Sequence, residues 1–193
     1  MRKIPSLFKR NYDGDRLVRD EVVEGSEWVL NGEGLATVKW DGTACMMRDG
    51  VLFKRFDRKR NKRGEMKPAP KGWEPCEAEP NEHTGHWPGW VPIGGGDEDR
   101  WFRETPHSGL LDGTYELTGP KIQGNPYERS VRSFKRHGFA ELHKDPRTYE
   151  DIRKFLDRCH IEGIVWHHPD GRMVKIKRKD FGFTWPPPKR EET

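Results

Sequence analysis

Two Asp-Gly pairs, each set between stretches of alternating apolar and polar residues, constrain the fold of this 193-residue chain more than any other feature. Asp49-Gly50 lies within residues 44–56, and Asp170-Gly171 lies within residues 163–178. An Asp-Gly pair in this position is typical of a two-residue hairpin turn, because both turn residues need a positive φ. The sequence therefore predicts two antiparallel hairpins.

Two further segments carry the alternation of a β-strand. Residues 34–39 place Ala36 and Val38 on one face and Thr37 and Lys39 on the other, and residues 113–120 return to strand character later in the chain. Strands outnumber helices and most connections are hairpins. The expected class is therefore α+β with antiparallel sheets.

Residues 145–160 give the strongest helical pattern. Pro146 suits a first helical turn, and Thr148 with Asp151 offers an alternative capping box. The apolar stripe of this helix consists of Tyr149, Ile152, Phe155, Leu156 and Cys159.

Two neighbouring segments have opposite charge. Residues 54–67 hold eight Lys or Arg against two acids, whereas residues 72–104 hold eight acids against two Arg and are rich in Pro, Gly and Trp. The basic run could follow a nucleic-acid backbone or be a solvated loop, and the sequence favours neither. The acidic segment indicates an irregular insertion at about residues 68–108 of a single domain, residues 1–183, before a flexible Pro-rich tail at residues 184–193.

The composition argues against disordered and membrane classes. Eight Trp are too many for a disordered chain, and no apolar run reaches a membrane span or forms a signal peptide. Cys45, Cys76 and Cys159 lack C-x-x-C spacing, so we expect free thiols and no zinc site. The net charge of +4 is compatible with a polyanionic partner. We expect a cytoplasmic monomer with no membrane partner.

Lys39 ends a predicted strand and is followed by Asp41 and Gly42. A lysine amine becomes a nucleophile when a dry site or nearby cations favour its neutral form. Asp41 has the same parity and could hold the ammonium or a metal ion. The alternative is a surface lysine on an edge strand.

The second hairpin supplies further charges. Lys175 and Lys177 lie two residues apart, so they share a face and could bracket a phosphate. With Asp170-Gly171 as a two-residue turn, Pro169 pairs with Arg172, and Glu162 lies opposite Lys179 and diagonal to Lys177. An amphipathic hairpin with a solvated cationic face is the alternative.

Two more charged residues come from other predicted strands. Arg55 pairs with Ala44 in the first hairpin and returns close to Asp41, where a guanidinium could bind phosphate or ribose oxygens. Glu116 faces away from Tyr115 and Leu117, and it would point into a cavity if those two are core residues.

These segments, in this order, resemble the covalent nucleotidyltransferase superfamily, which includes ATP-dependent DNA and RNA ligases and mRNA capping enzymes. "KWDGT" (39–43) is similar to its K-x-D-G motif, "FKRF" around Arg55 to the arginine motif, and "YELTGPKIQGNPY" (115–127) to a segment of RNA ligase 2-type enzymes. "EGIV" (162–165) and "VKIKR" (174–178) are similar to the fourth and fifth motifs. The whole, residues 28–181, also resembles small 5′-to-3′ RNA ligases.

The resemblance implies a ligase-type adenylation fold, ATP-grasp-like, with antiparallel sheets flanked by a few helices. It implies that Lys39 attacks the α-phosphate of ATP, that Arg55 contacts the ribose or an RNA 5′-phosphate, and that Glu116 binds the ribose hydroxyls. It also implies that Glu162 acts on Mg²⁺, or Mn²⁺, and steers Lys39, and that Lys175 and Lys177 neutralise the α-phosphate. Asp41 and Val38 belong to the same nucleotide site. The implied partner is RNA with 5′-phosphate and 3′-hydroxyl ends.

The chain departs from the family pattern at two places. The strand whose aromatic residue stacks on adenine is not clear, and Phe139 or Phe134, in residues 133–142, could take that role or be core residues. A sixth motif and a downstream OB domain are not seen, which disfavours a capping enzyme or typical DNA ligase. The alternatives to an RNA ligase are a catalytically silent nucleic-acid-binding module, a DNA-joining relative and a GMP-transferring relative.

Overall fold

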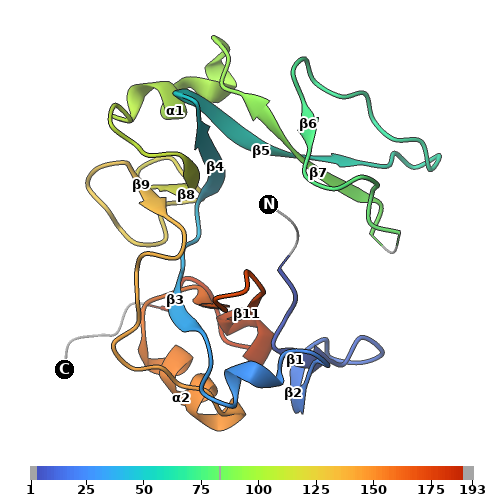
Figure 1. The fold of residues 1–193 in the computed structure, drawn as a ribbon, viewed down its shortest axis with the longest axis vertical. Coiled ribbons are helices and arrows are strands. Elements are labelled where there is room, and N and C mark those ends of the chain that lie inside the picture. Colours follow the sequence, from blue (N-terminus) through green and yellow to red (C-terminus); the bar gives the residue numbers. More distant parts are fainter. Residues whose placement is uncertain (1–3, 83, 189–193) are drawn as a thin grey trace. The chain divides into compact units, whose positions relative to one another are not determined.

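The computed structural model describes residues 4–82 and 84–188 (Figure 1). The chain divides into two compact units. Unit 1 contains Gly42–Arg136, and unit 2 contains Ile4–Asp41 together with the segment that starts at His137. The chain thus enters unit 1 directly after Asp41, and each unit is described separately below.

Unit 1 is built on a six-stranded antiparallel sheet with the order β6-β7-β5-β4-β8-β9. The β4–β5 hairpin confirms the first predicted turn, because Asp49 and Gly50 both have positive φ angles and Cys45 pairs with Lys54. This is the register that brings Arg55 back towards Ala44. The strands are β4 (Thr43–Arg48), β5 (Val51–Lys59), β6 (Glu74–Pro75), β7 (His86–Pro92), β8 (Gly113–Thr118) and β9 (Ser133–Arg136).

The core of unit 1 lies on one face of this sheet. Two short helices, η2 (Asp97–Asp99) and α1 (Arg100–Glu104), follow β7, and Phe102 of α1 is buried with the core. The other buried members of this core are Cys45, Met47, Leu52, Tyr115, Leu117 and Ile122. Tyr115 and Leu117 are therefore core residues, as the placement of Glu116 required.

The acidic segment is more regular than the sequence indicated. Within residues 68–108, β7 pairs with β5 from Phe53↔Pro92 to Lys59↔His86 (Figure 1). Position 89 of this strand is a glycine because the ring of Trp73 covers it: a Cβ there would lie 2.1 Å from Trp73 Nε1. The composition of a loop, Pro, Gly and Trp, thus conceals a strand.

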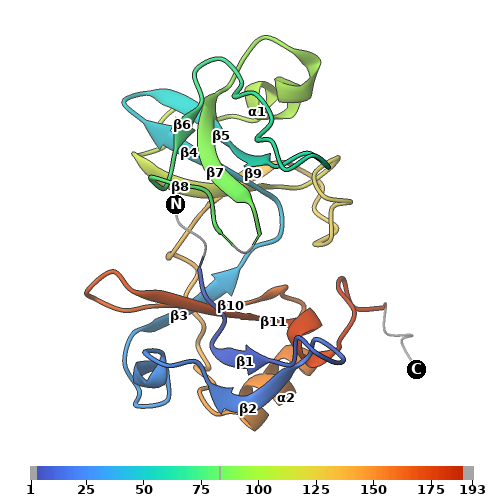
Figure 2. The same ribbon diagram turned by 90° about the vertical axis from the view of Figure 1, so that its right-hand side faces the viewer.

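Unit 2 contains a three-stranded antiparallel sheet with the order β11-β10-β3 (Figure 2). Its strands are β3 (Leu35–Lys39), β10 (Gly163–His167) and β11 (Met173–Lys177). Single stretches extend both edges: Leu7 N donates to Lys175 O at 2.9 Å, and Val38 N donates to Ala140 O at 2.8 Å. The remaining elements are β1 (Phe8–Arg10), β2 (Val18–Val22), η1 (Glu27–Val29), α2 (Tyr149–Arg158) and η3 (Arg178–Phe181).

The α2 helix covers one face of the unit 2 sheet. Thr148 is its N-cap and accepts a hydrogen bond from Asp151 N, so the second of the two predicted starts is correct. Ile152 and Leu156 of α2 are fully buried, as are Ile164 and Ile176 of the sheet. Ala36, Trp166 and Val174 share this core, which confirms the predicted faces of β3 and β11.

The register of the second hairpin differs by one residue from the prediction. Gly163 pairs with Lys177 and His167 pairs with Met173, and His168 N donates to Arg172 O at 2.9 Å. Pro169 therefore joins Asp170 and Gly171 in a three-residue loop. As a result Arg178, not Lys179, lies opposite Glu162, and Arg178 N donates to Glu162 O at 2.9 Å.

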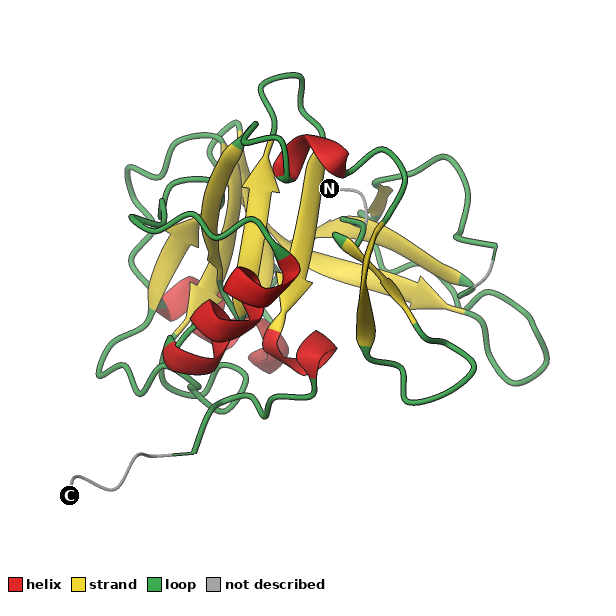
Figure 3. Cartoon of the chain, turned by 90° about the horizontal axis from the view of Figure 1, so that it is seen from below, coloured by secondary structure: helices red, strands yellow, loops and turns green. Residues whose placement is uncertain are grey.

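The structure confirms an α+β class with antiparallel sheets and few helices (Figure 3). The three cysteines are free, as predicted. Among the residues that the structure describes, no helix has both the length and the apolar character needed to cross a membrane.

Candidate active site

The face of the unit 2 sheet opposite α2 carries three lysines. Gly163 of β10 pairs with Lys39 on one side and with Lys177 on the other. Two residues further along β10, Val165 pairs with Thr37 and with Lys175 in the same way. Paired residues of an antiparallel sheet point to the same side, so Lys39, Lys175 and Lys177 share one face. We call these three residues the lysine row.

Gly163 separates Lys39 from Lys177 without placing a side chain between them. A Cβ at this position would lie 2.1 Å from the carbonyl oxygen of Ile176 and 3.0 Å from the Cα of Lys177. Any larger residue would push β11 away from β10. The glycine of the "EGIV" motif therefore sets the width of the lysine row.

Lys39 forms an ion pair with Glu162, the residue just before β10. The two side chains are only 22% and 13% exposed. Burial raises the pKa of the Glu162 carboxyl and Asp41 raises it further, whereas Lys39 and Lys177 lower it; burial is the largest influence, so the net change is upward. A carboxylate whose pKa is raised is better able to accept a proton from a neighbouring amine.

Lys175 lies two residues before Lys177 on β11, where the N-terminal segment pairs with that strand. Burial lowers its pKa to about 8, with Lys39 and Lys177 adding repulsion. Ser6 forms a parallel bridge with Lys175, and therefore shares its face. The Ser6 hydroxyl is buried and, within residues 4–82 and 84–188, has no hydrogen-bond partner.

Asp41 is held by a residue from the C-terminal segment. Trp185 Nε1 donates to Asp41 Oδ2 at 2.7 Å, and the Trp185 ring packs edge-on against His160. Arg178 Nε donates to Thr184 O at 3.1 Å. Thr184 and Trp185 are thus not part of a flexible tail as expected, and residues 189–193 of that prediction lie outside the described residues.

Phe139 directly precedes the stretch that pairs with β3. Thr37 forms an antiparallel bridge with Glu141, and Val38 N donates to Ala140 O at 2.8 Å. The Phe139 side chain is 68% exposed. Phe134, the other candidate, belongs to β9 of unit 1 and packs edge-on against Tyr115 and His107. Phe139 thus has the more exposed ring of the two candidates.

Three predicted site residues are not members of the lysine row. Val38 is on the α2 side of the sheet, because it alternates with Lys39. Arg55 and Glu116 belong to unit 1, where Arg55 pairs with Asp57 at 2.7 Å and places its guanidinium 5.9 Å from the Trp90 ring centroid. Their assignment to the nucleotide stays a prediction from the sequence.

Gly42, the last residue of the K-x-D-G motif, is needed for a steric reason within unit 1. A Cβ there would lie 2.1 Å from Leu117 O and 3.0 Å from Glu116 Cγ. The motif glycine thus allows the start of β4 to approach β8 closely.

The donors present fit a magnesium ion shared with phosphates. Glu162 and Asp41 are close enough for the charge of one to raise the pKa of the other. Among the described residues, no cluster of three or more His, Cys, Asp or Glu forms a complete metal cage. Mg²⁺ characteristically uses one or two carboxylates and completes its shell with water and substrate phosphates.

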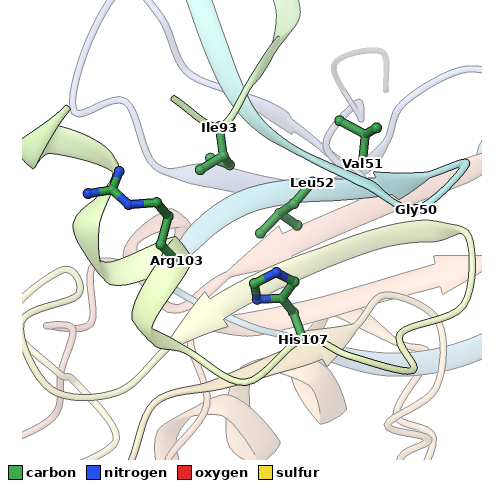
Figure 4. A pocket seen from close by; sticks show the side chains of 6 residues that line it. All are labelled: Gly50, Val51, Leu52, Ile93, Arg103 and His107. Atoms are coloured by element: carbon green, nitrogen blue, oxygen red, sulfur yellow. The ribbon is translucent and has the colours of Figure 1, made fainter. Parts of the chain in front are cut away.

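Unit 1 contains a pocket of about 290 Å³ (Figure 4). Arg103 lines it, and its guanidinium donates to Gly94 O and Gly96 O at 2.5 and 2.8 Å. His107 contacts Phe134. The lining is completed by Gly50, Val51, Leu52 and Ile93.

Comparison with known proteins gives consistent matches. Residues 96–191 match the family model described as RNA ligase 1. The chain is 27% identical to RNA ligase 1 of Mus musculus and to that of Rattus norvegicus, in each case over 97% of this chain and 82% of the relative. It is 30% identical to RNA ligase 1 of Pongo abelii over 64% of this chain and 51% of the relative. The segment that matches the family model, residues 96–191, contains Glu162 and two members of the lysine row, Lys175 and Lys177.

Proposed function

We propose that this chain, which is similar to RNA ligase 1 proteins over most of its length, is an ATP-dependent RNA ligase that joins 5′-phosphate and 3′-hydroxyl ends through a covalent lysyl-AMP intermediate. The observation that carries the proposal is the lysine row, with Lys39 paired to Glu162. Phosphoryl transfer depends mainly on positioning and on neutralising charge, and this face of the unit 2 sheet supplies both.

In the first step, the neutral amine of Lys39 attacks the α-phosphorus of ATP. A P–N bond forms, the bond from the α-phosphorus to the bridging oxygen breaks, and pyrophosphate leaves. The Lys39 amine must lose a proton to react, and Glu162 can accept it because its carboxylate already pairs with that amine. Lys175 and Lys177 neutralise the negative charge that grows on the phosphoryl oxygens.

The two later steps move AMP and then release it. A 5′-phosphate oxygen of RNA attacks the lysyl-AMP phosphorus, so the P–N bond breaks and a 5′-to-5′ pyrophosphate linkage forms. An RNA 3′-hydroxyl then attacks the 5′-phosphorus, loses its proton and displaces AMP. The product is a phosphodiester, and Lys39 returns to its starting state.

The nucleotide site needs more than the lysine row. We assign the adenine to Phe139, whose exposed ring offers a stacking surface. The Ser6 hydroxyl lies beside Lys175, is buried and has no hydrogen-bond partner among the described residues, so it suits a phosphate oxygen. Arg55 and Glu116 complete the assignment as sequence-based predictions for the ribose and phosphate, within a nucleotidyltransferase-type fold.

A divalent cation is part of the proposal. Mg²⁺ or Mn²⁺ would be held by Glu162 and Asp41, and its chemistry would be charge neutralisation on the phosphates. The chain's own residues then divide the remaining tasks: Glu162 takes the proton of Lys39, and Trp185 orients Asp41 through its indole N–H.

Retention of label on the protein tests the first step. Incubation with ATP labelled at the α-phosphate and Mg²⁺ should leave label on the denatured protein, and ATP labelled at the γ-phosphate should leave none. Lys39→Ala should abolish labelling. Lys9→Ala is the matched control, because Lys9 also pairs with a glutamate, Glu21, but lies outside the lysine row.

The outcome also separates the alternatives. Absence of label, or equal labelling of Lys39→Ala, would contradict the proposal and leave a catalytically silent binding module. A preference for labelled GTP would indicate a GMP-transferring relative. Joining of nicked DNA but not of RNA would indicate a DNA ligase.

A further inference from the structure

The end of β5 and the turn that follows it form a compact basic hairpin, residues 59–67, in unit 1. Its five cations are exposed and Glu65 is its single acid; the cations are Lys59, Arg60, Lys62, Arg63 and Lys67. Within the part of the chain that the structure describes, none of the five forms an ion pair with a carboxylate. This small element carries a local net charge as large as that of the whole chain, +4.

Hydrogen bonds within the basic hairpin give it a defined shape. Asn61 N donates to Glu65 O at 2.8 Å, and Gly64 N donates to Asn61 O at 3.0 Å. Asn61 Oδ1 also accepts from the backbone of Arg63 and of Glu65. Glu65 is engaged by the Asn61 amide at 2.9 Å, which leaves the cations as the groups presented to solvent.

The base of the basic hairpin is anchored by an aromatic clamp. The Arg58 guanidinium lies 4.9 Å from the Trp73 ring centroid and 5.3 Å from that of Trp87, and the two rings pack edge-on. Arg58 also donates twice to Lys67 O, at 2.7 and 2.9 Å. A half-buried guanidinium that contacts two indole rings and Lys67 O thus fixes the second strand of the hairpin to β5 and β7.

This construction is more than a solvated charged loop requires. A loop that serves only solubility keeps its cations mobile, whereas here the backbone is already ordered before any partner arrives. Cations carried on an ordered backbone bind a polyanion with a smaller entropy cost than cations on a disordered loop, and they gain from the release of its counterions. A row of phosphates on a single strand is the partner that a short, rigid, cationic hairpin complements.

We propose that the basic hairpin binds the phosphate backbone of the RNA that the enzyme joins. The inference rests on the proposed function for the identity of the polyanion. It is independent of the lysine row, because the hairpin is proposed to bind RNA, whereas the lysine row uses only ATP in self-adenylylation. Loss of the hairpin cations should therefore impair RNA binding and leave labelling of the protein by ATP unchanged.

The test compares two variants that each remove one lysine and one arginine. Lys62→Ala/Arg63→Ala changes the basic hairpin, and Arg153→Ala/Lys154→Ala changes exposed neighbours on α2. The affinity of each protein for a fluorescent, 5′-phosphorylated single-stranded RNA is measured by anisotropy at salt concentrations from roughly 50 to 300 mM. This range resolves the slope of log affinity against log salt concentration. Self-adenylylation and melting temperature are measured on the same samples.

The hairpin variant should bind the RNA about tenfold more weakly near 0.1 M salt. Its slope of log affinity against log salt should be flatter by about 1.4, because each lost phosphate contact removes about 0.7. The α2 variant should match the unchanged protein. Equal affinity of all three proteins, an equal loss in both variants, or a loss of self-adenylylation in the hairpin variant would overturn the inference. If the unchanged protein binds RNA but takes no label, the proposed function fails and the binding test still stands.

Discussion

Lys175 brings the demands of phosphate chemistry and of stability into conflict at a single residue. Its ammonium is largely removed from water and lies beside two other cations, which is why its pKa falls from an ordinary 10.5 to about 8. A charged lysine in this place destabilises the folded chain. A bound phosphate would offset that cost, which is the reason to expect such a residue at a nucleotide site.

Lys175→Met should raise the melting temperature at pH 7 and abolish self-adenylylation. The shift from 10.5 to about 8 corresponds to on the order of 3 kcal/mol, which the apolar side chain would recover. Thermal unfolding followed by circular dichroism measures the gain. Lys154→Met is the control, because Lys154 is 59% exposed on α2 and its replacement should leave both properties unchanged.

The pH dependence of the unchanged protein gives a second readout of the same residue. Between pH 8 and pH 10.5, Lys175 is deprotonated in the folded state and protonated in the unfolded state. The unfolded state then binds more protons, so the contribution of Lys175 to stability rises with pH across this window. The advantage of Lys175→Met should accordingly shrink towards pH 10.5, and a variant less stable than the unchanged protein at pH 7 would contradict the argument.

At the scale of the element, the sequence predicts faces well and register less well. Alternation alone places Lys39, Lys175 and Lys177 on the side opposite the core, because side-chain parity follows from strand geometry. The Asp170-Gly171 signal located the second turn correctly. It did not reveal that Pro169 joins the loop, and this single residue moves Glu162 from Lys179 to Arg178.

The β7 strand shows a second limit of local patterns. Its sequence, "HWPGWVP", has the composition of a loop. It is a strand because β5 offers a long pairing edge and because the Trp73 ring fills the space above Gly89. Tertiary contacts of this kind override local propensity and leave no local signal.

Gly163→Ala tests whether the spacing between β10 and β11 matters. The added methyl would meet Ile176 O at 2.1 Å, so β11 must move and Lys177 must move with it. Overpacking of this kind typically lowers the free energy of unfolding by about 1–3 kcal/mol, so we expect a melting temperature several degrees lower. The loss of self-adenylylation should be far larger than the loss of folded protein. Ile164→Val, on the same strand but in the core on the α2 side, is the control: it removes one methyl group away from the lysine row, and it should retain labelling. Full labelling of Gly163→Ala would contradict the role of the glycine.

At the scale of the whole molecule, both ends of the described chain return to the unit 2 sheet. Residues 5–7 pair with β11 and bring Ser6 beside Lys175, and Trp185 reaches Asp41 just after β3. The sequence motifs identify the residues between these ends but not Ser6 or Trp185. A serine near the N-terminus and a tryptophan in a Pro-rich segment gain their significance only from the fold that places them, whereas the K-x-D-G and lysine-x-lysine motifs carry theirs in the spacing.

A double-mutant cycle between Trp185 and Asp41 tests whether this return orients the site. Trp185→Phe keeps the aromatic contact with His160 and removes the 2.7 Å hydrogen bond to the Asp41 carboxylate. Hydrogen bonds to charged groups contribute about 1.5–3 kcal/mol to stability, so the melting temperature should fall by several degrees. The rate of self-adenylylation at saturating ATP should fall about tenfold or more beyond the loss of folded protein, because the Asp41 carboxylate is no longer held in place. In an Asp41→Asn background the same substitution should have a much smaller effect, because the charge-assisted bond is already lost. Equal effects of Trp185→Phe in both backgrounds would show that the indole acts independently of Asp41, and that the C-terminal segment only packs beside the lysine row.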